Sequence, residues 1–278
     1  MAPRLAAFAN PFQPKEETSM LTGTQFNGTQ PASIALSALP VPAGPLSGLL
    51  QAARDELVGL AAGRGVALSV VFDMPALVRV NEAAVAAGSW EPMLPAAHPA
   101  CRSLTPANAF WICGTAACGD VVTAQAGLLY DCSAQSIGDR FNAMTVFYDD
   151  PATQAPDGEW CTCTSDTANS TRGQVVWTNA GWTRPDVQGR GLFPICQRAN
   201  KLAAWLLWSP TWFISVVDPD IVPVWAERKM GPRHIDREPA ITYNQIGLKT
   251  LPMHLVRFSR AQFLGDLAQI AADLAQAA

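Results

Sequence analysis

The sequence contains little charge and few residues that titrate near neutral pH. Only 15% of its 278 residues are Asp, Glu, Lys or Arg, and it has three histidines and three tyrosines. The formal net charge is −4, and no cluster of Lys and Arg offsets it. Because nucleic acids are bound through concentrated positive charge, these absences argue against a general nucleic-acid-binding protein.

Long apolar runs are also absent. The densest run, Leu202 to Trp208, is far shorter than the roughly 20 residues that cross a bilayer. The N-terminus has an early Arg4 but lacks the apolar region of a secretory signal peptide. With 49% apolar residues, the chain is predicted to be a globular, cytoplasmic protein with a sizeable core and no membrane contact.

The seven cysteines do not have the spacing of a metal site. Cys161 and Cys163 form one pair, but neither a second pair nor a nearby His completes four zinc ligands. In a cytoplasmic chain we expect reduced cysteines, and apolar neighbours favour Cys113 and Cys196 as small core residues. For Cys196 the alternative is a thiol nucleophile, which its place on an apolar helix face disfavours. We predict no bound metal.

One stretch has the order strand, glycine loop and helix. Residues 175–183 are rich in β-branched and aromatic side chains, and Pro185 ends strand pairing because it has no N–H to donate. The chain then reads QGRG before a helix pattern begins at Leu192. The free N–H groups and the dipole of such a helix N-terminus suit a phosphate or pyrophosphate, which the glycines let the backbone approach. An ordinary surface turn is the alternative interpretation.

This loop resembles the acetyl-CoA loop of the GNAT superfamily of N-acetyltransferases. The loop contains neither the dinucleotide fingerprint nor the Gly-Lys-Ser/Thr of nucleoside-triphosphate loops. The GNAT motif is Gln/Arg-x-x-Gly-x-Gly/Ala, after a strand that ends hydrophobic-x-Pro. Gln188 and Gly191 occupy the matching places, while Phe193 stands where Gly or Ala is usual. The match is specific over residues 182–193 and extends over residues 66–259 in element order.

We predict a mixed α/β (α+β) fold in which a GNAT-like central mixed β-sheet is flanked by helices. Residues 1–44 are expected to be a flexible tail or surface arm. Residues 45–260 form the GNAT-like domain, with a turn-rich insertion at 149–172, and residues 261–278 form an amphipathic C-terminal helix. The proline-rich segment 90–108 is predicted to be an ordered loop or substrate-side crossover. The expected helices are 45–62, 75–87, 192–206, 224–230 and 263–278, and the strands are 66–72, 110–113, 121–130, 140–148, 175–183, 212–217, 240–246 and 251–258.

The resemblance implies an acyltransferase that moves acetyl from acetyl-CoA to an amine by direct attack, without a covalent enzyme intermediate. It places the negatively charged oxygen of the tetrahedral intermediate near the backbone N–H of Thr183, beside Trp182. The side chain of Arg190 either adds positive charge or is an ordinary solvated arginine. The residues that the resemblance assigns to the cofactor are Trp182, Thr183, Gln188, Gly189, Arg190, Gly191, Leu192 and Phe193.

The catalytic residues depart from the family pattern. The frequent acid is a Tyr four residues before the glycine that ends a short helix, and Glu227 has that place; it is otherwise a solvent-facing helix residue. No Asp, Glu or His lies between Gln174 and Thr183, so a base must come from elsewhere. Tyr148, Asp149 and His234 are candidates, with alternative roles as a strand aromatic, a turn residue and a surface histidine.

Two other functions stay open at this stage. A catalytically degenerate GNAT-like domain would bind acyl-CoA or a protein partner without turnover, and a scaffold would bind no cofactor. The acceptor of an active enzyme would be a small-molecule or peptide amine, and the acidic net charge is too small to select cationic ones. The tryptophans either line a pocket for a hydrophobic acceptor or pack in the core.

Overall fold

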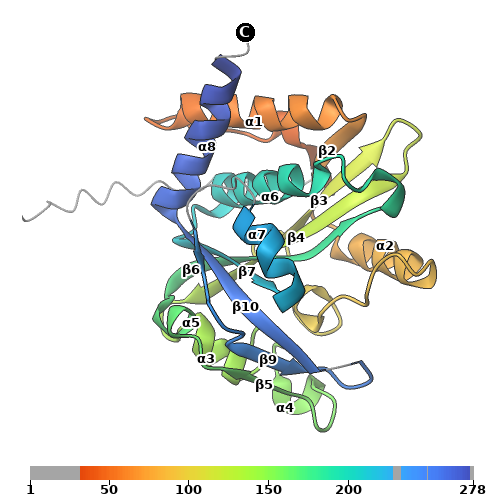
Figure 1. Cartoon of the computed structure of the whole chain (residues 1–278), viewed down its shortest axis with the longest axis vertical. Helices are drawn as coiled ribbons and strands as arrows, with labels where there is room; N and C mark the ends of the chain where they lie inside the picture. Colours follow the sequence, from red (N-terminus) through yellow and green to blue (C-terminus); the bar gives the residue numbers. More distant parts are fainter. Residues whose placement is uncertain (1–31, 228–232, 249, 276–278) are drawn as a thin grey trace, which may run out of the picture.

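The strands form one large, mostly antiparallel sheet (Figure 1). The computed structural model describes residues 32–227, 233–248 and 250–275. Across the sheet the order is β1-β2-β3-β4-β6-β7-β10-β9-β5, with β8 paired to β10. The bounds are β1 Ser33–Ala35, β2 Val66–Val71, β3 Ala109–Ala116, β4 Val121–Cys132, β5 Trp160–Cys163, β6 Gly173–Thr183, β7 Trp212–Val217, β8 His234–Ile235, β9 Ile241–Asn244 and β10 Thr250–Ser259.

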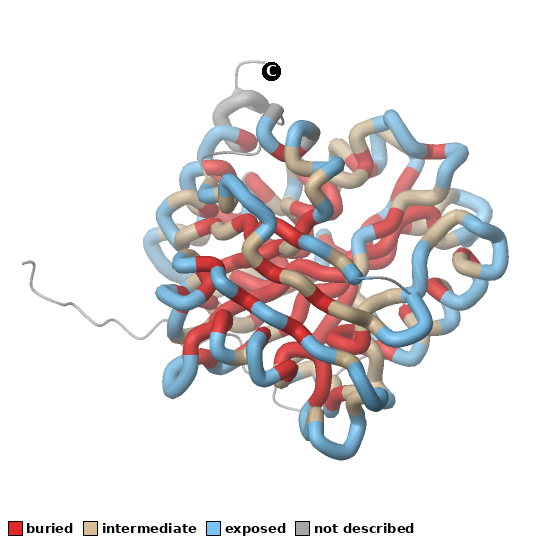
Figure 2. Tube along the Cα trace, turned by 60° about the horizontal axis from the view of Figure 1, so that its bottom comes forward, coloured by how far each residue is buried: buried red, intermediate tan, exposed pale blue. Residues whose placement is uncertain are grey.

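Helices cover both faces of this sheet. On one face, α1, α6, α7 and α8 contribute to a core with Leu57, Leu202 and Phe263. On the other face, α2, α3 and α5 contribute to a second core with Leu77, Phe141 and Trp177. Figure 2 shows buried residues along the central strands and exposed residues around the rim. The helices are α1 Ser47–Ala62, α2 Met74–Ala86, α3 Ile137–Asn142, α4 Pro151–Gln154, α5 Asp166–Ser170, α6 Leu192–Trp208, α7 Val222–Glu227 and α8 Arg260–Ala275.

Most predicted elements are confirmed because their signals are local. The alternating side chains of residues 66–71 put every second one in the core, as expected of a strand with two different faces. Helix α2 begins where its cap predicts, since the side chain of Asp73 accepts a hydrogen bond from the N–H of Ala76 at 3.1 Å. The antiparallel β3–β4 hairpin and the order strand β6, loop, helix α6 are also as predicted.

The strand predicted at 140–148 is wrong. Residues 137–142 form helix α3, which a capping box begins. Ser136 Oγ accepts from the N–H of Asp139 at 3.0 Å, and Asp139 Oδ2 accepts from the N–H of Ser136 at 2.9 Å. Alternating apolar residues suggested a strand, but the reciprocal cap satisfies two backbone donors and commits the segment to a helix.

Two segments expected to be peripheral contribute to the sheet. Residues 33–35 form edge strand β1 on β2, and the following Leu36 and Leu39 are buried. In the 149–172 segment, residues 160–163 form β5, which pairs with β9 at the far edge of the sheet. Their short strands are stabilised by pairing with distant residues, which no local pattern predicts.

Helix α6 is buried on more of its surface than predicted. The sequence places Arg198 and Lys201 opposite its apolar face, toward solvent, and this is wrong for Lys201, which is 1% exposed. Helix α8 and strand β10 cover that side. Arg198 Nη2 lies 2.9 Å from Asp266 Oδ1 of α8, and Lys201 Nζ lies 3.7 Å from the ring centroid of Phe258. None of the described helices is long and apolar enough to span a bilayer.

Candidate functional site

Strands β6 and β7 pair only briefly and then separate. They are the one parallel pair among the described strands, and their register covers residues 175–177 against 212–214. Beyond this point Thr178 Oγ1 donates to the carbonyl of Ile214 at 3.2 Å and contacts Ser215 Oγ. The next residues of β6 carry a bulge against β4, with Ala180 at a φ of 48°. The separation leaves one edge of β6 without a strand partner.

The side chain of Asn179 stabilises this bulge. Its Oδ1 accepts a hydrogen bond from the N–H of Ala180. A positive φ is unfavourable for a residue with a Cβ, so such a local bond helps to hold Ala180 in this conformation. The bulge therefore redirects the end of β6 as it leaves β7.

The predicted glycine loop forms at the N-terminus of α6. Gly189 and Gly191 have φ values of 76° and 74°, which favour glycine, and Gly191 is the N-cap of the helix. Gln188 Nε2 donates to the carbonyl of Thr183 at 2.9 Å, and Arg64 Nε donates to the carbonyl of Arg190 at 2.6 Å. These bonds fix the loop so that the first N–H groups of a 17-residue helix are presented together.

The peptide group of Thr183 points away from β4. Arg184 donates its N–H to the carbonyl of Val122 at 2.9 Å. Because peptide groups alternate in direction along an antiparallel strand, those of Thr183 face the opposite side, where β7 has separated. The hydrogen bond from Gln188 to the Thr183 carbonyl agrees with this direction.

Arg184 contributes little free positive charge to the loop. Its guanidinium lies 2.7 Å from Asp186 Oδ1 and 3.1 Å from Asp120 Oδ2. The hydrogen bonds from Arg184 hold the pKa of the Asp186 carboxyl below its usual value. Binding of an anion at the loop would therefore depend mainly on backbone N–H groups and on the dipole of α6.

A pocket of about 740 Å³ runs along this loop; we call it the loop pocket. One wall is made by the stacked rings of Trp90 and Trp182, whose centroids are 5.3 Å apart. Trp182 Nε1 donates to the carbonyl of Ser89 at 3.0 Å, which joins the segment after α2 to the end of β6. The lining residues are Ser89, Trp90, Glu91, Gly181, Trp182, Thr183, Val187, Gln188, Gly189, Gly191, Leu192, Phe193, Pro194 and Ile221.

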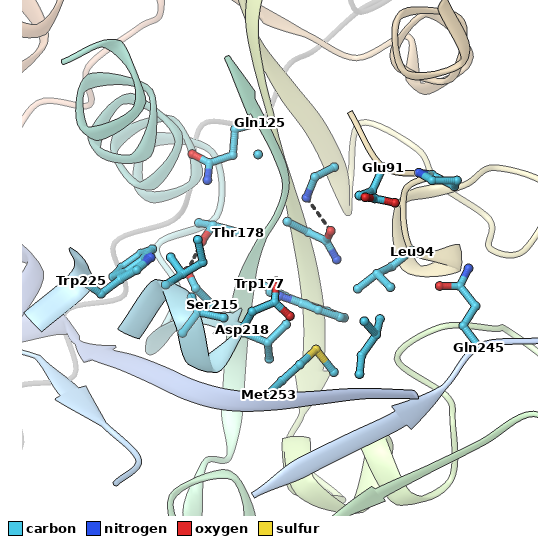
Figure 3. Close-up of a pocket in the computed structure, with 18 of the residues that line it drawn as sticks. Glu91, Leu94, Gln125, Trp177, Thr178, Ser215, Asp218, Trp225, Gln245 and Met253 are labelled. Atoms are coloured by element: carbon cyan, nitrogen blue, oxygen red, sulfur yellow. Dashed lines mark hydrogen bonds between the residues drawn. The ribbon is translucent and has the colours of Figure 1, made fainter. Parts of the chain in front are cut away.

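A second pocket of about 700 Å³, the sheet pocket, is lined from both faces of the sheet (Figure 3). Its lining includes Phe193, Val217 and Trp225 of the core that contains α6, and Trp177 and Met253 of the other core. Figure 3 shows Glu91, Leu94 and Gln245 on one side of β6 and Gln125, Thr178 and Trp225 on the other. The pocket thus passes through the gap between the separated strands, and both volumes are typical of ligand sites.

Four residues line both pockets and mark where they meet. They are Glu91, Gly181, Phe193 and Ile221. The ring of Phe193 packs against Gly181, since a Cβ on that glycine would lie 2.9 Å from Phe193 Cε2. Among the residues lining either pocket, the ionisable side chains are the carboxylates of Glu91 and Asp218. The junction therefore combines a carboxylate with an exposed edge of backbone.

Residue Asn81 of α2 holds the segment that carries Glu91. The buried Asn81 donates through Nδ2 to the carbonyl of Glu91 at 2.9 Å and accepts from the N–H of Met93 at 3.2 Å. One side chain thus satisfies backbone groups on both sides of Pro92, which fixes the loop over the pocket junction.

The structure brings together seven of the eight residues assigned to the cofactor. Trp182, Thr183, Gln188, Gly189, Gly191, Leu192 and Phe193 line the loop pocket. Arg190 lies in the same loop, but its Nη2 donates to the carbonyl of Asp186 at 3.1 Å.

Of the predicted catalytic residues, Tyr148, Asp149 and His234 line neither pocket. Tyr148 is buried and donates to Glu159 Oε1 at 2.5 Å, where Tyr243 also donates, and burial raises the pKa of Tyr148. His234 contacts Thr167 Oγ1 at 2.8 Å and Asp236 Oδ1 at 3.0 Å. Glu227 ends α7, and its side chain lies outside the described residues. Asp149 accepts from the N–H of Ser103 at 2.6 Å.

Sequence reasoning missed Glu91, Asn179 and Gln245 as pocket residues. Glu91 follows a helix stop in the segment that the sequence predicts to be an ordered loop or substrate-side crossover, so its position carried a weak signal. Asn179 is a polar residue inside an apolar strand, an arrangement that costs stability unless the residue has a role. Among the described residues no group of three or more His, Cys, Asp or Glu side chains is placed to hold a metal.

No protein-family model and no curated protein matches the chain. Solved structures that it resembles are N-acetyltransferases. RimJ of Mycobacterium smegmatis in complex with CoA-disulfide is 11% identical with a TM-score of 0.40, covering 73% of this chain and 88% of that chain. A GCN5-related N-acetyltransferase from Kribbella flavida is 14% identical with a TM-score of 0.36, and the match covers 71% of this chain and 99% of that chain. The spermidine N-acetyltransferase from Vibrio cholerae in complex with CoA and spermine is 7% identical with a TM-score of 0.32, and the match covers 56% of this chain and 69% of that chain.

The expectation of a mixed sheet flanked by helices is confirmed by the chain's own topology. Its parallel β6–β7 pair separates beside a glycine loop, and a helix follows that loop directly.

Proposed function

We propose that this protein is an acyl-CoA-dependent N-acyltransferase that transfers acetyl from acetyl-CoA to an amine. The observation that carries the proposal is the junction of two pockets at the end of β6. The loop pocket offers backbone N–H groups at a helix N-terminus, and the sheet pocket continues from it through the gap between β6 and β7. A long anionic cofactor and a separate acceptor can therefore meet at Gly181 and Glu91.

The polar groups on the α6 side fit a CoA-type ligand. The pyrophosphate would be bound by N–H groups of residues 189–193, with the α6 dipole adding partial positive charge. Gln125 and Gln197 line the sheet pocket, are each 2% exposed, and their Oε1 atoms have no hydrogen-bond partner among the described residues. Unpartnered buried acceptors are uncommon, and the two amide N–H groups of a pantetheine arm would satisfy them.

The chain's residues supply the requirements of acyl transfer as follows. An amine nitrogen attacks the thioester carbonyl, a C–N bond forms, and the C–S bond then breaks to release the thiol while the nitrogen loses its proton. The N–H of Thr183, which faces the open edge of β6, is suited to an anionic oxygen.

Binding of acyl-CoA without turnover is a second candidate, favoured by one observation. The Phe193 ring packs on Gly181 at the pocket junction. A cofactor arm that reaches the junction must share this space with the ring or displace it. Acetylation of an amine by the protein would distinguish the enzyme from a protein that only binds acyl-CoA.

Thermal unfolding with and without excess acetyl-CoA tests the cofactor site. A ligand that binds only the folded state raises the midpoint by mass action. We expect this rise in the wild type and its loss in Gly189→Glu, where the added side chain meets open space in the structure but opposes an anion. Gly119→Glu is the matched control, because Gly119 also has a positive φ and open surroundings but lies in the β3–β4 turn and lines neither pocket.

Each result has a defined meaning. If acetyl-CoA raises the thermal midpoint of the wild type and of Gly119→Glu but not of Gly189→Glu, the result supports the loop as the cofactor site. The absence of a rise in folded wild-type protein contradicts the acyltransferase and the binding-only candidate together. A rise without acetylation of any amine favours binding without turnover.

A further inference from the structure

The half of the sheet pocket away from α6 contains two buried hydrogen-bond donors that have nothing to bind. Trp177 Nε1 and Asn179 Nδ2 have no hydrogen-bond partner among the described residues. Trp177 is fully buried, and Asn179 is 7% exposed. They lie two positions apart on β6, so both side chains belong to the same face of the sheet. A buried donor that stays unpaired has lost its hydrogen bonds to water, and a ligand that accepts hydrogen bonds would restore them.

Apolar side chains make up most of the remaining wall on this face. Leu94, Leu251 and Met253 line the pocket here and pack with the core that contains Trp177. Pro92 and Val216 also line it. A charged group placed among these side chains would lose its hydration without compensation.

The junction and rim carry negative charge and hydrogen-bond acceptors. Glu91 lines both pockets and Asp218 lines the sheet pocket, and the described part of either lining contains no Lys, Arg or His. Gln245 adds a buried Oε1 without a partner among the described residues. A cleft with charges of one sign attracts the opposite charge and repels its own, so an ammonium group is favoured and a carboxylate is disfavoured.

From these observations we infer the acceptor class: a compact apolar amine that carries an uncharged hydrogen-bond acceptor, such as an ester or amide carbonyl, close to its nitrogen. The amine lies at the junction with Glu91, and the carbonyl oxygen accepts from Asn179 Nδ2 and Trp177 Nε1. Asn179 precedes the junction residue Gly181 by two residues, which span at most about 7 Å of chain, so the two groups of the ligand must be closely spaced. This inference rests on the proposed acyltransferase function.

Four probes with acetyl-CoA test the class. Leucine methyl ester has the amine, the carbonyl and an apolar side chain; 3-methylbutylamine is the same molecule without the ester. Leucine adds a carboxylate, and spermidine replaces the apolar body with further ammonium groups. We expect kcat/KM for the ester to exceed that for each other probe at least tenfold, because a site with buried donors rejects a ligand that leaves them unpaired.

Asn179→Asp separates a specificity role from a structural one. Aspartate retains the oxygen that accepts from the Ala180 N–H, but replaces the donor Nδ2 with a second acceptor. The ratio of kcat/KM for leucine methyl ester to that for 3-methylbutylamine should fall at least tenfold, mainly through KM for the ester. Asn169→Asp adds the same charge on an exposed residue of α5 that lines neither pocket, and should leave this ratio unchanged.

Glu91→Gln supplies a second variant on an exposed loop, where folding is less at risk. It should raise KM for the ester and for 3-methylbutylamine by similar factors, since both carry the ammonium group. Equal kcat/KM for the four wild-type probes, or an unchanged ratio in folded Asn179→Asp, overturns the acceptor class while the acyltransferase stands. If acetyl-CoA raises the midpoint but no probe is acetylated, the acceptor class is overturned; if it does not raise the midpoint, the proposed function fails as well.

Discussion

Arg198 Nη2 lies 2.9 Å from Asp266 Oδ1, and this ion pair joins the glycine-loop helix α6 to the C-terminal helix α8. Arg198 Nε makes a second hydrogen bond to the same carboxylate, at 3.1 Å to Oδ2. The bidentate geometry is the strong form of this interaction. Because Asp266 is 3% exposed, its charge depends on the pair for compensation. The helix that follows the glycine loop is thereby fixed to α8.

Asp266→Asn should destabilise the protein by about 3–5 kcal/mol, because it removes the charge of the buried carboxylate that pairs with Arg198 and lies near Lys201. Urea unfolding measures this change. Arg79→Ala is the control: its contact with Asp73, at 3.4 Å, joins two exposed side chains and should contribute less than about 1 kcal/mol. Similar stabilities for Asp266→Asn and the wild type would contradict the role given to the pair.

Lys201 should make stability depend on pH. Burial lowers the pKa of its ammonium to about 7, whereas an unfolded lysine titrates near 10.4. Between these values the unfolded chain binds more protons than the folded one, so the free energy of unfolding rises with pH, by up to about 1.4 kcal/mol per pH unit from this group. Lys201→Met should flatten the rise between pH 7 and 10, as measured by urea unfolding. The same slope in the variant would show that another group causes it.

Gly127 should tolerate no side chain. A Cβ there would lie 2.7 Å from Phe110 Cζ and 3.0 Å from Asn200 Oδ1, at the contact between β4 and α6. Gly127→Ala should therefore destabilise the protein by about 1–3 kcal/mol through overpacking. Gly59→Ala is the opposite case, because its Cβ meets open space inside α1 and alanine is the better helix former by about 1 kcal/mol. A calorimetric midpoint that falls in the first and rises in the second confirms both; equal shifts would refute them.

The local parts of the fold were predictable because their signals are short in sequence. Helix α2 has its cap and proline within a few residues, and the glycine loop lies between a β-branched strand and an apolar helix. The strand prediction at 140–148 was wrong although the capping box that begins helix α3 is equally local. Competition between two local patterns is settled by which one satisfies the backbone hydrogen bonds.

The burial of Lys201 was unpredictable from helix periodicity. The pattern of α6 correctly places Leu202 and Leu206 in the core, but it has no information about a second layer. That layer is α8, whose Phe263 packs against Phe213 with ring centroids 4.8 Å apart. A residue on the polar side of a helix becomes buried when a distant element packs there, and the charge then requires a partner such as Asp266.

The strand, glycine loop and helix could be predicted from the sequence alone, because backbone conformation there depends on neighbouring residues. The resemblance of this loop to the GNAT motif then gave the expectation of a CoA-type cofactor. Tertiary structure alone decided which side chains meet that loop. Trp182 reaches Ser89, and Glu91 and Asn179 line the same pocket, only because sheet pairing and the packing of α2 bring distant segments together. Long-range contacts are selected by burial over the whole core, which no local pattern encodes.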